Sequence, residues 1–393
     1  MTLGMNRRQF LGFAALAPLA LAAPRLAFAA ASAAQPKRTL VLVELAGGND
    51  SLNMVVPYAD PRYYALRQGI AVPREKVLQL DPRFGLHPAL EPMMAMWQAK
   101  DLAVALGVGY DRPNRSHFRS IDIWDTASDS SQYLDDGWIA RLYAEPQAGR
   151  SVVADAIVLG GGSRAVSGKG IRAIVLNDPE QFARASQMVH GSEVATPNPA
   201  LAHILKVRDD IEKAGATLRQ VEANAPALGV DFPKHKLGTE LHSAARLIAS
   251  GAHVPVIKVS LSGFDTHSNQ PARQAQLYAH VAEALAAFRQ AMIKAGAWDR
   301  VLMITYSEFG RRVAQNGSNG TDHGTAASHF VLGGKVRGGF IGAAPSLDNL
   351  DAGDLRFTQD FRSLYATASQ SWLQLAGTRD VLGNHRPLDV LRA

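Results

Sequence analysis

Short apolar runs that alternate with amphipathic segments are the feature that most constrains the fold of this chain. The runs are typical of strands buried on both faces, and they cover 39–45, 102–106, 156–159, 254–261 and 301–306. Between them, the segment Gln270–Ala295 repeats Leu277, Val281, Leu285 and Phe288 at helical spacing. Because strands joined through helices form parallel sheets, the alternation predicts an α/β fold with a mainly parallel sheet covered by helices on both faces.

No segment rich in proline, glycine or serine divides the chain after residue 39. Further helices are expected at 197–224 and 236–250, with a loop at 225–233 between them. The length alone allows about two domains of ~150 residues each, but large α/β sheets often exceed that size. We therefore expect a single domain over 39–393.

Residues 1–29 have the pattern of a twin-arginine signal peptide. Asn6-Arg7-Arg8-Gln9-Phe10-Leu11 precedes an alanine-rich apolar run, and Ala27-Phe28-Ala29 predicts cleavage after Ala29. An uncleaved anchor is the alternative. Residues 30–38 would then be a flexible leader, and no other stretch approaches ~18 uninterrupted apolar residues. We expect a periplasmic or secreted protein without a stable membrane span after cleavage.

Charge and cysteine content exclude several kinds of function. The formal net charge of the chain is +6, and it falls to +3 without the signal peptide, which carries three arginines and no acidic residue. This mild charge does not predict binding to nucleic acid. The chain has no cysteine, which excludes disulfides, thiolate metal ligands and a cysteine nucleophile.

Acidic and histidine side chains follow three of the predicted strands. Asp50 follows the first strand, Asp265 and His267 follow 254–261, and Asp322 and His323 come after 301–306. Ligands bind beyond the carboxyl ends of parallel strands, and carboxylate oxygen and imidazole nitrogen are donors that Zn²⁺ accepts. One such aspartate alone is as well explained by a turn or a helix cap. Three groups together predict a metal site.

The segment Arg115-Ser116-His117-Phe118-Arg119, after the strand at 102–106, supplies candidate catalytic groups. A serine hydroxyl close to a metal loses its proton readily, and arginine binds phosphate oxygens through two hydrogen bonds. Ser116, Arg115 and Arg119 are therefore candidate catalytic residues. Equally, Ser116 could cap the helix that follows.

Motifs along the chain resemble those of the exported DUF1501 family, over nearly all of the chain after the signal. They are Leu45-Ala46-Gly47-Gly48-Asn49-Asp50, Asn53, Val55-Val56-Pro57-Tyr58, Arg115-Ser116-His117-Phe118, Asp122, Trp124, Gly263-Phe264-Asp265-Thr266-His267, Ser307-Glu308-Phe309-Gly310-Arg311 and Asp322-His323. This family is in turn distantly similar to the alkaline phosphatase and sulfatase superfamily. The resemblance implies a three-layer α/β/α fold with an alkaline-phosphatase-like core and two metal ions.

The superfamily resemblance also implies roles for individual residues. Ser116 lies at the position of the nucleophile. The residues that resemble the ligands of one metal are Asp50, Asp322 and His323, and those that resemble the ligands of the other are Asp265, His267 and His329. One residue separates Asp265 from His267 where the superfamily commonly has three, which leaves direct ligation by both open. A buried histidine bonded to backbone is the alternative for His329.

The sequence thus predicts an exported, metal-dependent hydrolase of phosphate or related esters, with a serine nucleophile and a small anionic ester as substrate. Zn²⁺ is the expected metal, with Mn²⁺, Mg²⁺ and Ca²⁺ as alternatives. The C/S-x-P-x-R pattern of a formylglycine sulfatase is missing around Ser116. Glu308 could bind the metal or pair with Arg311 or Arg312. The alternative function is a non-catalytic binding or assembly protein on a hydrolase scaffold.

Overall fold

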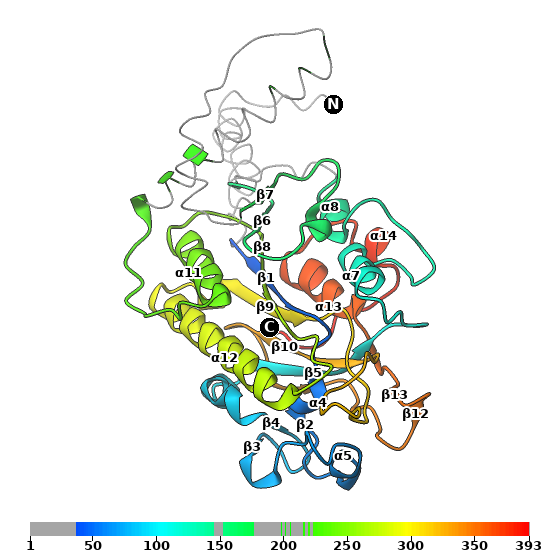
Figure 1. Cartoon of the computed structure of the whole chain (residues 1–393). Coiled ribbons are helices and arrows are strands. Elements are labelled where there is room, and N and C mark those ends of the chain that lie inside the picture. The colour runs from blue at the N-terminus through cyan, green and yellow to red at the C-terminus, as the bar shows by residue number, and fades with distance from the viewer. Residues whose placement is uncertain are drawn as a thin grey trace, which may run out of the picture. The chain divides into compact units, whose positions relative to one another are not determined.

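The computed structural model describes residues 37–144, 152–176 and 223–392, together with a few single positions between 198 and 220 (Figure 1). The predicted signal peptide and most of the predicted helix at 197–224 lie outside these residues. Arg38–Ala393 is one compact unit. None of the helices in the described part of the chain combines the length and apolarity needed to cross a membrane.

Nine strands of the described chain form the central sheet, in the order β11-β5-β10-β9-β1-β8-β6-β7, with β14 beside β5. Their bounds are β1 Thr39–Ala46, β5 Leu102–Gly109, β6 Ala156–Val158, β7 Ala173–Val175, β8 Val256–Ser262, β9 Val301–Tyr306, β10 Ala327–Leu332, β11 Gly339–Ile341 and β14 Gln359–Asp360. Strand β1 is parallel to β8 and β9, whereas β10 is antiparallel to β5 and β9. Strands β1, β5, β8 and β9 therefore end at the edge of the sheet where β10 begins.

The five predicted strands all form, with small differences at their ends. Strand β8 begins at Val256, two residues later than predicted, after Pro255, which has no N–H to give to a sheet. Strand β5 continues to Gly109. His329 lies inside β10.

Helices cover both faces of the sheet. One layer consists of α11 (Lys236–Ala249) and α12 (Gln270–Lys294), and the other contains α7 (His117–Thr126), α8 (Trp138–Tyr143), α13 (Arg362–Ala366) and α14 (Thr378–Leu382) (Figure 1). Alternate residues of β1 enter the two cores: Val41 and Val43 pack with α11 and α12, and Leu40 and Leu42 pack with α7 and α8. The predicted three-layer α/β/α fold with a mainly parallel sheet is confirmed.

Smaller elements surround these layers. Strands β2, β4 and β3 form a separate small sheet, and β12 pairs with β13. The bounds are α4 Ser51–Met54, β2 Val55–Val56, α5 Pro61–Leu66, η1 Arg74–Lys76, β3 Leu78–Gln79, β4 Gly85–Leu86, η2 Pro88–Met93, α6 Met94–Gln98, η3 Arg164–Val166, η5 Trp298–Arg300, β12 Leu350–Asp351, β13 Asp354–Leu355 and the π-helical turn η6 Thr367–Trp372.

Candidate metal centre

Four loops meet at the edge of the sheet where β1, β5, β8 and β9 end. Residues 47–50 follow β1, residues 110–116 lead from β5 into α7, residues 263–269 join β8 to α12, and residues 307–326 join β9 to β10. Parallel strands that end together bring such loops to one place, which is where ligands of α/β proteins bind. The candidate residues are built on these four loops.

His117, Asp265 and His323 form a group that could hold a metal ion, since one ligand atom of each lies within 4.8 Å of the others. His117 Nε2 is 3.5 Å from Asp265 Oδ2, and His323 Nε2 is 3.3 Å from Asp265 Oδ1. The three side chains are 33%, 46% and 23% exposed. The group is therefore open to solvent on one side.

His267 adds a fourth donor next to this group. Its Nε2 lies 2.9 Å from Asp265 Oδ1 and 3.0 Å from His323 Nε2. Donors around a tetrahedral Zn²⁺ with bonds of about 2.0–2.1 Å are roughly 3.3 Å apart, so the spacing of His267, Asp265 and His323 is close to that of a ligand set.

Each of the three histidines has an oxygen atom beside its Nδ1. His117 Nδ1 is 2.8 Å from Glu308 Oε1, His323 Nδ1 is 2.8 Å from the Arg115 carbonyl oxygen, and His267 Nδ1 is 3.4 Å from Asp322 Oδ1. A proton on Nδ1 that is donated to oxygen leaves the Nε2 lone pair free for a metal. Within the described part of the chain, His117 Nε2 is buried and has no hydrogen-bond partner. The donor set thus fits a divalent cation.

Arg311 keeps the Asp265 carboxylate ionised. Burial alone would raise the pKa of Asp265, but the hydrogen bond from Arg311 Nη2, at 2.7 Å, and the charge of Arg311 lower that pKa to about 2. The hydrogen bond to Glu308 raises the pKa of His117, whereas burial lowers the pKa of His323. A negative oxygen therefore faces the imidazole nitrogens at neutral pH.

The buried guanidinium of Arg311 also ties three of the loops together. It donates to the carbonyl oxygens of Gly48 at 2.5 Å, Thr321 at 2.9 Å and Phe264 at 3.1 Å. Gly47 has a φ of +118°, and a Cβ at this position would lie 2.5 Å from the Asp265 nitrogen. Only glycine permits this approach of the two loops.

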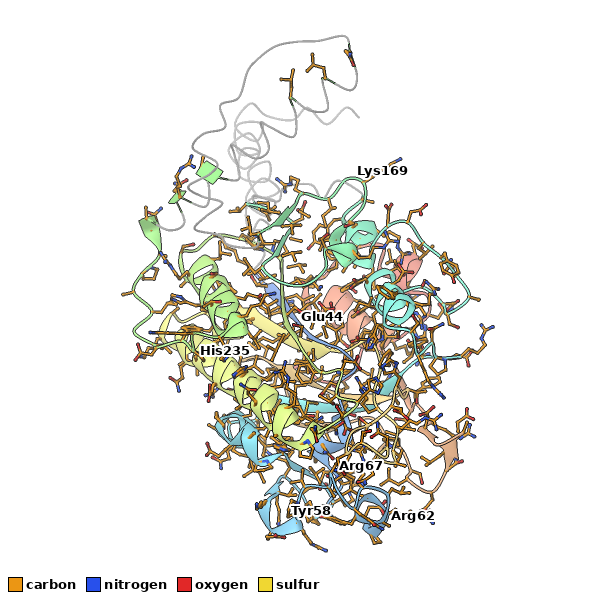
Figure 2. All side chains as sticks on the ribbon, in the orientation of Figure 1. Glu44, Tyr58, Arg62, Arg67, Lys169 and His235 are labelled. Carbon is orange, nitrogen blue, oxygen red and sulfur yellow. The ribbon has the colours of Figure 1, made fainter. Side chains whose placement is uncertain are left out.

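Asp50 lies outside the group formed by His117, Asp265, His267 and His323. Asp50 Oδ2 accepts hydrogen bonds from Arg67 Nη1 at 2.5 Å and Gln270 Nε2 at 2.6 Å, and Oδ1 caps α4. Gln270 in turn accepts hydrogen bonds from the hydroxyls of Thr266 at 3.0 Å and Thr321 at 2.7 Å. Asp50 thereby supports the loops that carry the donors. Arg67 lies on the side of the molecule that carries α4 and α5 (Figure 2).

His329 also lies outside the group of donors. It is fully buried in β10, where its ring is 5.5 Å from the ring of Trp124. Neither ring nitrogen has a hydrogen-bond partner among the described residues, and burial lowers the pKa of His329 to about 3. The imidazole is therefore neutral and packs as a core side chain.

The three candidate catalytic residues lie within two positions of His117 in the sequence. Ser116 is exposed at the N-cap position of α7, and its side chain does not cap the helix. Arg115 is paired with Asp354. Arg119 is paired with Asp122 and its guanidinium lies 3.9 Å from the ring centre of Tyr133. Both guanidiniums are thus occupied by protein groups, and the Ser116 side chain is left open to solvent.

His117 was not among the metal ligands predicted from the sequence, and its contact with Glu308 was not predicted. Glu308 pairs neither with Arg311 nor with Arg312 but accepts hydrogen bonds from His117 and from the Gly47 nitrogen, at 2.8 and 2.9 Å. His117 and Glu308 are 191 positions apart. Both follow strands that end beside Asp265 and His323, and this position after a strand is the signal that could have indicated them.

Comparisons with known proteins relate the chain to one protein family. Residues 176–371 match the family described as "Protein of unknown function (DUF1501)". A comparison with curated protein sequences gives no match.

Several solved structures are similar to the chain. Ps i-CgsB in complex with k-i-k-neocarrahexaose has a TM-score of 0.38 and 11% identity, over 86% of this chain and 72% of its own. The PsFucS1 sulfatase from Pseudoalteromonas sp. has a TM-score of 0.36 and 11% identity, over 89% of this chain and 73% of its own. A protein of the alkaline phosphatase superfamily from Vibrio parahaemolyticus has a TM-score of 0.34 and 12% identity, over 79% of this chain and 64% of its own. These likenesses are loose, so the roles of residues rest on the geometry of this chain.

Proposed function

We propose that this member of the DUF1501 family is a metal-dependent hydrolase of phosphate or related esters, with one Zn²⁺ ion held by His117, Asp265, His267 and His323. The observation that carries the proposal is the convergence of imidazole Nε2 atoms on the Asp265 carboxylate, each with its Nδ1 facing an oxygen atom. Imidazole with one carboxylate is a donor set that Zn²⁺ prefers.

One metal ion is favoured over the two expected from the sequence. The second ion would need Asp50 or His329. Asp50 is already bonded to Arg67 and Gln270, and His329 is buried beside Trp124. Asp322 Oδ1 lies 3.4 Å from His267 Nδ1, the nitrogen on the other side of the ring from Asp265, and would orient that ring.

The exposure of the cluster favours a catalytic rather than a structural metal. Structural zinc sites are closed by four protein ligands, whereas catalytic sites keep a position open to water or substrate. Asp265 and His267 are each nearly half exposed. A Zn²⁺ ion bound here would polarise the ester oxygen and stabilise negative charge on it.

Ser116 is the proposed nucleophile. It is exposed and directly precedes the ligand His117. Its Oγ would form a bond to phosphorus as the bond to the leaving alcohol breaks, and the serine proton would pass through solvent to that alcohol. Water would then cleave the new ester and release phosphate. Arg115 would bind the charged group only after giving up its pair with Asp354.

Export is part of the proposal. The twin-arginine pathway carries folded chains, so a centre that acquires its metal before export is compatible with the signal pattern at residues 1–29. The chain with Arg7 and Arg8 both changed to lysine should stay in the cytoplasm when cells are fractionated. Equal export of this variant would remove the twin-arginine route.

The Ser116→Ala variant tests the mechanism. The purified chain should contain about one zinc per molecule by elemental analysis, and the variant should keep that zinc. Hydrolysis of a phosphomonoester, phosphodiester and sulfate-ester panel should fall by about 100-fold or more in the variant. Ser346→Ala, at another exposed serine, is the matched control and should keep full activity.

Two results would overturn the proposal in different ways. Full activity of Ser116→Ala would remove Ser116 from the mechanism. A folded chain that binds no Zn²⁺, Mn²⁺ or Ca²⁺ and hydrolyses none of the esters would instead support the non-catalytic binding or assembly protein.

A further inference from the structure

A cavity of about 560 Å³ lies directly beside the candidate metal centre. Its walls come from residues 109–113 and Arg115, which lead into His117, and from Thr325 and Ala326, which closely follow His323. A third wall is formed by residues 351–352 and 354–357 of the β12–β13 region. We call this cavity the alcohol pocket.

Arg115 lies between the alcohol pocket and His323 of the candidate metal centre. Arg115 lines the pocket, and its carbonyl oxygen accepts the hydrogen bond from His323 Nδ1 at 2.8 Å. A molecule in the pocket is therefore separated from the ligand His323 by a single residue. An ester held at the metal could extend its alcohol part into the pocket.

The charges that line the pocket cancel in pairs. Asp111 pairs with Arg112 at 3.1 Å, Arg356 with Asp351 at 3.9 Å, and Arg115 with Asp354. A charged ligand group would be attracted by one member of each pair and repelled by the other. A hydroxyl group can donate to the carboxylates and accept from the guanidiniums, so it suits this lining.

Two further groups point to a ligand with several hydroxyls. Asp354 is almost fully buried, and its Oδ1 has no hydrogen-bond partner in the described part of the chain. Arg312 Nε lies 3.9 Å from this oxygen, beyond hydrogen-bond distance. Phe357, with 39% exposure, offers an apolar surface in the same wall. An acceptor without a donor and a partly exposed ring suit the hydroxyl and C–H faces of a polyol.

We propose that the alcohol pocket binds the uncharged, polyhydroxylated alcohol part of an ester whose charged group lies at the metal centre. This proposal rests on the proposed hydrolase function and adds the class of alcohol that the enzyme releases. Arg356, Asp351 and Phe357 would select the substrate.

Glucose 6-phosphate and n-hexyl phosphate test the proposal, because both carry the same phosphate on a chain with the same number of carbons. The wild-type chain should have a kcat/KM at least about tenfold higher for glucose 6-phosphate. Arg356→Ala and Asp351→Ala should each remove most of this preference. Arg337→Ala is the matched control, since Arg337 is 56% exposed and paired with Asp389, and Arg356 is 53% exposed.

A binding measurement separates failure of the pocket from failure of the hydrolase. Methyl glucoside carries no phosphate, and its binding can be followed by saturation-transfer NMR on the whole chain. We expect a signal in the wild type and in His323→Ala, and a signal at least several-fold weaker in Arg356→Ala. If neither ester is hydrolysed, this pattern still supports the pocket and only the hydrolase fails.

Two outcomes would overturn the pocket itself. The first is equal kcat/KM for the two esters in an active wild type, which leaves the hydrolase intact. The second is a methyl glucoside signal that is lacking, or that is the same in the wild type and in Arg356→Ala.

Discussion

Asp50 and Asp265 each follow a strand of the central sheet, yet the Asp50 side chain is buried and the Asp265 side chain is nearly half exposed. Asp50 is 1% exposed and bonded to Arg67, which is fully buried. Asp265 is 46% exposed and lies among His117, His267 and His323, with Arg311 behind it. The neighbours of the two carboxylates, rather than their positions after a strand, decide what each can do.

The difference between the two aspartates is chemical. Arg67 and Gln270 donate to Asp50 Oδ2 and the Leu52 nitrogen donates to Oδ1, so both oxygens of this buried carboxylate already have protein partners. Histidines with their Nδ1 atoms facing oxygen atoms present lone pairs on Nε2, so the Asp265 cluster offers a set of donors that fits a cation. Asp50 is therefore expected to act as a structural group and Asp265 as a ligand.

The largest effect should come from Arg67→Ala, which leaves the Asp50 charge buried without its cation. The free energy of unfolding should fall by about 3–5 kcal/mol, measured by urea denaturation in the presence of a chelator. Arg62→Ala removes an exposed arginine from its pair with Asp348 and should cost less than about 1 kcal/mol. Similar losses for the two variants would contradict the structural role of Asp50.

His323→Ala should weaken metal binding and leave the stability of the fold nearly unchanged, the reverse of Arg67→Ala. It removes a donor from the cluster, so the affinity for Zn²⁺ should fall by at least about 100-fold, more than the loss of an outer partner costs. The free energy of unfolding without metal should change by less than about 1 kcal/mol. Affinity is measured by competition with a chelating dye. His385→Ala, at a histidine near Asp360, is the control, and an equal loss there would show that the cluster is not the site.

Glu308→Gln should have a smaller effect on the same affinity. Glutamine keeps the shape and can still accept the His117 hydrogen bond, but it no longer carries the charge beside that ring. We expect an affinity about tenfold lower, at the lower end of the range for outer partners of metal ligands. Glu240→Gln, at a buried glutamate that accepts from the Ser260 nitrogen, should leave the affinity unchanged. An unchanged affinity in Glu308→Gln would remove Glu308 from the centre.

Local patterns predicted the fold and pointed to three of the four residues that we propose as metal donors. The strands were recognisable because burial on both faces leaves continuous apolar runs, and Asp265, His267 and His323 were recognisable because they follow such strands. The difference between Asp50 and Asp265 could not be recognised from the sequence, because Arg67 and Arg311 reach these carboxylates from other segments of the chain. The same holds for His117, whose partner Glu308 belongs to a distant loop.

The smallest effect should be the pH dependence contributed by Asp265. Its pKa of about 2 in the folded chain lies below the ordinary 3.8, because Arg311 outweighs the effect of burial. The carboxylate therefore stabilises the fold above about pH 4, and this contribution is lost as the pH falls towards 2. Since nearly half of the side chain is exposed, we expect less than about 1 kcal/mol after solvent screening.

Asp265→Asn isolates this contribution in metal-free chain. The difference in unfolding free energy between wild type and variant, from urea curves between pH 5 and 2, should shrink as the pH falls. A difference that stays constant over this range would show that Asp265 is not held as the anion. If it shrinks by less than about 1 kcal/mol while Arg67→Ala costs several, the open aspartate contributes little to folding. Its ionised oxygen is then held mainly for a ligand, which is the role that Asp50 cannot have.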